Sequence, residues 1–143
     1  MSTIVKFFVA SPSDAADSLN CGPNGSLRTV ESGNFDVEEA LLDWEAHLTG
    51  SALEELVDRE VPEVFAESEE EGPIVFLLSD ALLESFSSSS SFQVGELAKW
   101  WVEKKSQDGF PIDLFIASEI LQDLVHLIHE ERLPGENVYC WTS

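Results

Sequence analysis

The sequence predicts an α+β fold in one domain spanning residues 1–143, with a small mixed or antiparallel sheet of three or more strands packed against several helices. Three observations lead to this prediction. The length of 143 residues is typical of one domain. A hydrophobic share of 43% is enough to build a core. Short β-branched and aromatic runs alternate with segments of helical period, and each kind of layer needs the other to bury its apolar side.

Three runs are predicted to be strands. Residues 4–10, 73–78 and 138–141 are dominated by β-branched, aromatic and other apolar residues, which is typical of mostly buried strands. The spacing between these runs is irregular, and no glycine-rich phosphate-binding turn follows the first one. A doubly wound α/β fold is therefore disfavoured.

Helices are predicted between these strands, and most of them follow a serine or an acidic cap. The second helix begins after Asn34 or Asp36 and ends at Gly50, which suits a left-handed C-terminal cap. Its inward face is expected to contain Val37, Ala40, Leu41, Trp44 and Leu48. Its acidic residues are expected to face mainly outwards, namely Glu38, Glu39, Asp43 and Glu45. The predicted helices cover residues 11–20, 37–49, 53–57, 79–86, 92–105 and 113–131.

The C-terminal half contains two further expectations. Residues 87–91 are an unbroken serine run, which predicts a mobile connection between helices. The helix after it is expected to bury Val94, Leu97 and Trp101. The last helix is expected to bury Leu114, Ala117, Leu121, Leu124, Val125 and Ile128.

Cys21 and Cys140 are too few for a disulfide framework, and they form no CxxC metal motif. Two reduced thiols are the expected state, although the sequence leaves a bridge between them open. The N-terminal apolar run is short for a secretory signal, and no apolar stretch approaches the roughly 20 residues that span a bilayer. We therefore expect a cytoplasmic protein without membrane association.

The charge balance is the strongest anomaly of the composition. The chain has 28 acidic and 7 basic residues, a net charge of -21. Nucleic-acid binding by phosphate neutralisation and membrane binding through a polybasic segment both need a basic footprint, so we expect neither. Between Glu31 and Glu71, 15 acidic residues accompany the single basic residue Arg59. Solubility alone explains such a stretch in one interpretation, and docking on a basic protein explains it in the other.

The preferred hypothesis is a non-enzymatic module that binds a basic protein, in its sharpest form an immunity-type inhibitor or a protein that mimics DNA. Trp100 is added as an anchor, because neighbouring tryptophans point about 100° apart on a helix and Trp101 takes the buried position. No cofactor is expected, and the oligomeric state stays open. The candidate partner-binding residues are Asp36, Glu38, Glu39, Asp43, Glu67, Glu69, Glu70, Glu71 and Trp100.

The alternative is an enzyme, a metal-assisted hydrolase that uses His126, His129 and Glu130. Residues three apart are neighbours on a helix, and histidine and glutamate are ligands for zinc. The solvated side of an ordinary helix explains the same residues, and no HExxH motif or second cluster completes a site. No catalytic or metal-binding residue is therefore assigned.

One segment resembles a known family. The run Leu41-Leu-Asp-Trp-Glu-Ala-His-Leu-Thr-Gly50 resembles a segment of the YfbM-like bacterial family of unknown function, in which a tryptophan-containing helix ends in a Leu-Thr-Gly turn. The opening strand, the Gly72-Pro73 step into a strand and the closing Tyr139-Cys-Trp141 are similar in layout, as in small uncharacterised actinobacterial proteins. The resemblance implies an α+β fold and no activity, since the family has no established catalytic residues.

Overall fold

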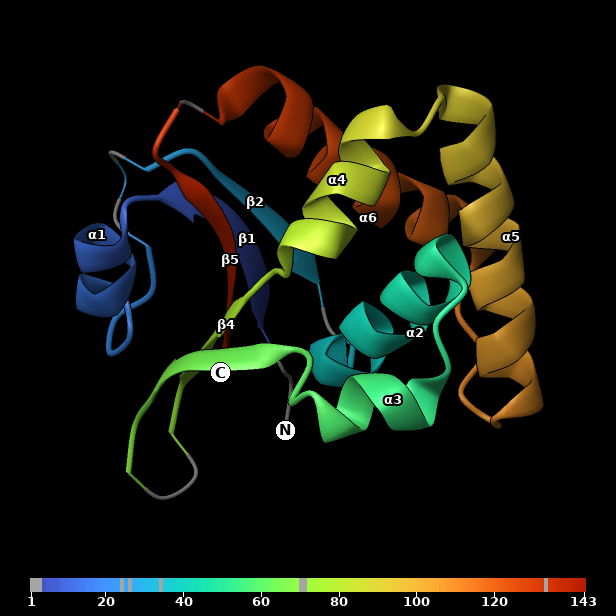
Figure 1. Cartoon of the computed structure of the whole chain (residues 1–143), viewed down its shortest axis with the longest axis horizontal. Coiled ribbons are helices and arrows are strands. Elements are labelled where there is room, and N and C mark those ends of the chain that lie inside the picture. The colour runs from blue at the N-terminus through green and yellow to red at the C-terminus, as the bar shows by residue number, and fades with distance from the viewer. Residues whose placement is uncertain (1–3, 24, 26, 34, 70–71, 133) are drawn as a thin grey trace.

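The computed structural model describes residues 4–143 apart from 24, 26, 34, 70–71 and 133, and it confirms the predicted α+β class. Within the described residues, five strands form one antiparallel sheet in the order β2-β1-β5-β4-β3. Helices α2 to α6 lie over one face of this sheet and α1 lies against the other (Figure 1). The strands are β1 (Val5–Ala10), β2 (Thr29–Gly33), β3 (Glu63–Glu67), β4 (Ile74–Leu77) and β5 (Asn137–Thr142).

The helices begin and end close to the predicted positions. Asp36 caps the second one by accepting a hydrogen bond from the Glu39 backbone N–H, and Gly50 ends it with a left-handed φ of 74°. Ser11 and Ser79 cap the first and fourth helices in the same way. The helices are α1 (Pro12–Asp17), α2 (Val37–Thr49), α3 (Leu53–Asp58), α4 (Asp80–Ser88), α5 (Ser91–Gln107), α6 (Leu114–His126) and the π-helical turn η1 (Leu127–Glu131).

The two central strands face a core on each side. Phe7 and Val9 of β1 point into the large core beneath α2 to α6, whereas Phe8 points into a small core with Ala15 of α1. Phe8 stacks on Tyr139 of β5, with ring centroids 5.6 Å apart. Because both faces are covered, β1 and β5 are mostly apolar, with Lys6 as their one charged residue, and this made them recognisable in the sequence.

An aromatic cluster organises the large core. The Trp44 ring of α2 contacts the rings of Phe7, Phe86 and Trp101. The Trp44 and Trp101 rings meet edge to face with centroids 5.0 Å apart, a geometry that stabilises by about 0.5–1.5 kcal/mol beyond the apolar area buried. The cluster joins α2, α4 and α5, and it determines which residues of α2 face each neighbour.

The sequence analysis missed both edge strands, β2 and β3. Each pairs with a neighbour on only one side, and polar residues interrupt its apolar pattern. In β3, the side chains of Glu63, Val64 and Glu67 are exposed. Charged residues on an edge discourage pairing with other chains, and they also weaken the strand signal in the sequence.

The serine run contributes to both neighbouring helices. Ser87 and Ser88 complete α4, and Ser90 caps α5 through a capping box with Gln93. Serine is a preferred N-cap, and the connection between the two helices consists of Ser89 and Ser90 alone. The mobility of this connection stays a prediction.

Three smaller features of the structure bear on the predictions. Leu114, predicted to be buried, is 43% exposed, and Ile120 takes a place in the core instead. Both cysteines are free, with Cys21 exposed, and burial raises the pKa of the Cys140 thiol well above its usual range. Among the described residues, no helix combines the length and the apolarity needed to cross a bilayer.

Candidate functional site

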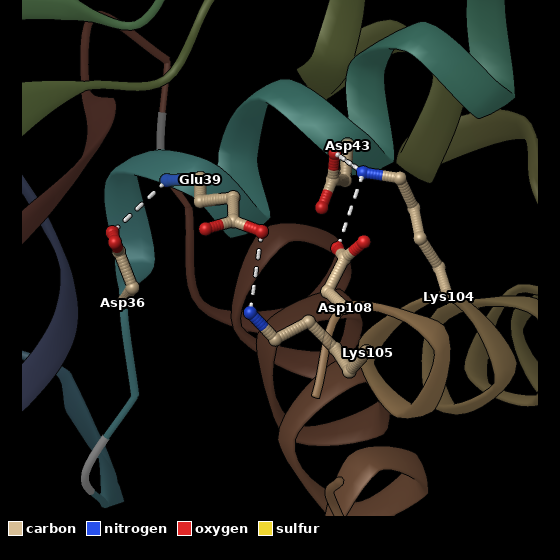
Figure 2. Close-up of polar contacts among 6 residues, drawn as sticks. All are labelled: Asp36, Glu39, Asp43, Lys104, Lys105 and Asp108. Atoms are coloured by element: carbon tan, nitrogen blue, oxygen red, sulfur yellow. Dashed lines mark hydrogen bonds and ion pairs between the residues drawn. The ribbon is translucent and has the colours of Figure 1, made fainter. Parts of the chain in front are cut away.

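An ionic contact joins α2 to the C-terminal half of α5 (Figure 2). Lys104 Nζ lies 2.6 Å from Asp43 Oδ1 and 4.0 Å from Asp108 Oδ2, and Lys105 Nζ lies 3.2 Å from Glu39 Oε1. Asp43 and Glu45 are each 2% exposed, so the prediction that they face outwards is wrong. Since α2 packs against α3, α4 and α5, it has more buried surface than its single apolar stripe indicates.

Burial and charged neighbours shift the pKa values of Asp43 and Lys104. Removal from water raises the pKa of the Asp43 carboxyl above its ordinary value, and the hydrogen bond from Lys104 opposes the rise. Asp43 Oδ2 has no hydrogen-bond partner among the described residues. The surrounding carboxylates outweigh the burial of Lys104 and raise the pKa of its ammonium group. One carboxylate oxygen of Asp43 is therefore paired with Lys104, whereas the other is buried without a hydrogen bond from the described residues.

Glu45 has a different structural role. The Ser79 hydroxyl donates a hydrogen bond to Glu45 Oε1, and the same hydroxyl accepts one from the Leu82 backbone N–H at 3.1 Å. Ser79 is the N-cap of α4, so the buried carboxylate on α2 orients the cap of a helix 34 residues later in the chain. This acidic residue holds two helices together and is not available to a partner.

A pocket of about 520 Å³ lies between the N-terminus of α2 and the C-terminus of α5, and we call it the α2–α5 pocket. Its wall is mostly aromatic and apolar, with two carboxylates and one ammonium group. One negative charge is therefore left over. The lining residues are Phe35, Asp36, Glu39, Trp101, Lys105, Gly109, Phe110, Pro111 and Ile112.

Several exposed apolar residues follow this pocket along the chain. We call them the turn face, defined as Phe110, Leu114, Phe115 and Ile116, which are 70%, 43%, 74% and 50% exposed. Phe110 belongs to the α2–α5 pocket, and Ile116 lines a second hollow of about 200 Å³ that includes Glu31, Glu119 and Asp123. Both ends of the turn face are thus bordered by carboxylates.

The turn face was not among the predicted sites, although the sequence contains a signal for it in three consecutive large apolar residues. Leu114, Phe115 and Ile116 are consecutive, and consecutive residues of a helix point about 100° apart. One helix face cannot bury all three, so at least one had to be exposed. The start of α6 just after a Gly-Phe-Pro turn leaves all three partly in solvent.

The predicted partner-binding residues separate into several groups. Asp36 and Glu38 are exposed at the start of α2, whereas Glu39 and Asp43 are paired with lysines. Glu67 and Glu69 are exposed near β3, and Glu70 and Glu71 lie outside the described residues. Trp100 is half-buried and stacks on His47 with ring centroids 4.2 Å apart, so its ring is already covered on one side.

The histidines of the enzyme alternative lie on two consecutive elements, with His126 as the last residue of α6 and His129 in η1. His126, His129 and Glu130 are exposed, and His129 Nε2 lies 3.1 Å from the Phe86 carbonyl oxygen. Both histidines line a shallow pocket with Ser89, Ser91 and Gln122. In the part of the chain that the structure describes, no group of three or more His, Cys, Asp or Glu side chains is placed to hold a metal ion.

Comparison with protein-family models, with curated proteins and with solved structures gives no match to this chain, so the YfbM-like resemblance stays a prediction.

Proposed function

We propose that this protein is a non-enzymatic module that binds a basic protein, and that the partner docks on the turn face. The observation that carries the proposal is the exposure of Phe110, Leu114, Phe115 and Ile116 within seven residues of chain. Aromatic and large aliphatic side chains are the residues that anchor protein interfaces.

Charge selects the kind of partner. The net charge is -21, and carboxylates border the turn face at Asp36, Glu31 and Glu119. Two copies of this chain would bring like charges together around the same apolar centre, which opposes self-association. A partner with basic residues around an apolar centre is complementary in both respects.

The exposed acids of α3, of β3 and of the turn between them support the same partner over longer distances. They raise the local concentration of a basic protein without belonging to the contact itself. Their side chains are exposed and accompany only Arg59, and they are Glu54, Glu55, Asp58, Glu60, Glu63 and Glu67.

Capture from the lysate of the source cells tests the proposal with three immobilised baits: the wild type, Phe115→Asp and the control Val57→Asp. Val57 is an exposed apolar residue of α3, 57% exposed, and each variant adds one negative charge. Basic proteins identified by mass spectrometry should be retained by the wild type and by Val57→Asp, and lost from Phe115→Asp. If charge alone retained the basic proteins, the Phe115→Asp bait would capture at least as much of them as the wild-type bait does. That result would contradict docking on the turn face.

Sedimentation equilibrium of the purified protein tests whether a second copy of this chain, rather than a basic partner, covers the turn face. We expect a monomer at low salt, because the charge keeps two copies apart. A dimer that Phe115→Asp dissociates would show that a second copy covers the turn face, and the proposal of a basic partner would then be wrong.

A further inference from the structure

The α2–α5 pocket already holds an ammonium group of the protein itself. Lys105 Nζ lies 3.2 Å from Glu39 Oε1 and 5.5 Å from the centroid of the Phe110 ring. A carboxylate together with an aromatic face is an arrangement that attracts cations, through charge-assisted hydrogen bonds and through the ring quadrupole. The position of Lys105 thus shows which chemistry this pocket favours.

Lys105 does not satisfy the whole pocket. Asp36 and Glu39 supply two carboxylates against one ammonium group, and Asp36 is exposed at the rim. Figure 2 shows a similar surplus beside the pocket, where Asp43 of α2 and Asp108 at the C-terminus of α5 share Lys104. In the same view Glu39 pairs with Lys105, and Asp36 accepts a hydrogen bond from the Glu39 backbone N–H. The Phe110 ring is 70% exposed and is therefore accessible from solvent.

We propose that the α2–α5 pocket receives an arginine side chain of the basic partner, and this inference rests on the proposed function and names its anchor. A guanidinium group is planar, so it stacks on an aromatic ring such as Phe110 while its N–H groups bind a carboxylate in a fork. A lysine ammonium offers a point charge without the stacking surface. The volume of about 520 Å³ is within the range of pockets that enclose a small ligand.

Lys105 then acts as an internal competitor. Its ammonium group occupies Glu39 in the free protein, and an incoming guanidinium must share or displace that contact. Removing the ammonium charge frees Glu39 and leaves the pocket more negative. The variant Lys105→Met should therefore bind the arginine more tightly than the wild type does, whereas loss of a residue that contacts the ligand directly would weaken binding.

The probes are three capped tripeptides of sequence Leu-Xaa-Leu, in which Xaa is arginine, citrulline or norleucine. Citrulline has nearly the shape of arginine without the charge, and norleucine is apolar. The readout is the NMR resonance of the Trp101 indole N–H, assigned with Trp101→Phe. Trp101 is the tryptophan that lines this pocket, and its indole N–H has no hydrogen-bond partner among the described residues.

Matched variants isolate the pocket from the overall charge. Glu39→Gln is compared with Glu38→Gln, its exposed neighbour on α2, because both remove one negative charge. Lys105→Met is compared with Lys99→Met on the same helix, where Lys99 pairs with Glu96 at 3.4 Å in a contact exposed to solvent. Long-range attraction changes equally within each pair, so a difference within a pair reports the pocket.

The arginine peptide should bind about tenfold more tightly than the citrulline peptide, as expected for a partly desolvated charge pair. Glu39→Gln should weaken arginine binding about fivefold or more relative to Glu38→Gln, and Lys105→Met should strengthen it several-fold relative to Lys99→Met. Three outcomes would each overturn the inference. The arginine and citrulline peptides could bind with equal affinity, the norleucine peptide could bind most tightly, or the Trp101 indole resonance could fail to shift up to about 20 mM peptide. These failures leave the proposed function standing if captured proteins still depend on Phe115.

Discussion

The acidic residues of α2 and those of α3 and β3 are neighbours in the sequence but differ in what they do. Asp43 and Glu45 of α2 are buried, with Asp43 paired to Lys104 and Glu45 bonded to Ser79. Glu54 and Glu55 of α3 are exposed and contact no lysine among the described residues. The first group holds helices together, whereas the second group contributes a field at the surface.

The difference shows why a count of charges along the sequence overstates the surface available to a partner. Lys104 and Lys105 come from α5, more than 60 residues after the acids that they neutralise. The excess of negative charge remains, but within the segment from Glu31 to Glu71 the longest run of exposed acids lies in α3, in β3 and between them. The predictions below test this division between structural and surface acids.

The largest effect is expected at Asp43. Asp43→Ala should lower the free energy of unfolding by about 2–4 kcal/mol, because it removes one member of a mostly buried ion pair and leaves Lys104 without its partner. Glu39→Ala should cost less than about 1 kcal/mol, since the Glu39 side chain is 40% exposed and its contact with Lys105 is screened by water. Urea unfolding of the two variants measures both values.

The double variant Asp43→Leu/Lys104→Met sharpens this test. An apolar pair of similar size removes the cost of burying the carboxylate, so the double variant should be more stable than Asp43→Ala and close to the wild type. A double variant that is as unstable as the sum of the single changes Asp43→Leu and Lys104→Met would show that the two side chains do not interact energetically, and the proposed cost of leaving one partner unpaired would then be wrong.

A smaller loss of stability is expected at Glu45. Glu45→Ala should lower the free energy of unfolding by about 1–3 kcal/mol, because the Ser79 hydroxyl loses a buried charged acceptor. The control is Glu84→Ala on the exposed side of α4, which should change stability by less than about 0.5 kcal/mol. Equal effects of the two substitutions in thermal unfolding would contradict the structural role of Glu45.

These residues also mark how far the sequence could lead. The ends of α2 followed from Asp36 and Gly50, and its core stripe followed from helical spacing, because both signals are local. The burial of Asp43 and Glu45 depends on α4 and α5, which pack against the other sides of α2, and periodicity within one helix says nothing about those neighbours. β2 and β3 were not predicted for a related reason. Their place at the edge of the sheet depends on their neighbours, and the polar residues that edge strands keep weaken the strand pattern in the sequence.

The position of the candidate site could not be predicted from the sequence. The net charge predicts a basic partner, which stays a prediction, and the consecutive Leu114, Phe115 and Ile116 offered a signal for the exposed face. Trp100 had the composition of an anchor, but its stacking on His47 requires α2 and α5 to lie side by side. A residue 53 positions away decides how much of its ring is free, and sequence spacing cannot show that.

The pH dependence of stability gives a second test of the burial of Asp43. Because the folded pKa of Asp43 is raised, the folded state holds a proton over a pH range in which the unfolded state has lost it. Relative to Asp43→Asn, the wild type should therefore gain stability as the pH falls through the folded pKa of Asp43 towards 3.8, and this gain should be lost as the pH rises through that pKa. In Lys104→Met the pKa of Asp43, followed by carboxyl NMR, should rise further, because Lys104 lowers it.

The smallest effect on stability is expected for the surface acids. Reversing three of them together, in the variant Glu54→Lys/Glu55→Lys/Asp58→Lys, should change the free energy of unfolding by less than about 1 kcal/mol, because all three side chains are exposed and the net charge becomes less extreme. The same variant should slow association with any captured basic partner about tenfold or more at low salt, and it should leave the dissociation rate nearly unchanged. Surface plasmon resonance at two salt concentrations separates the two rates. A faster dissociation rate would show that these acids belong to the contact. The acids of α3 and β3 would then bind the partner directly, and the proposal that they only steer its approach would be wrong.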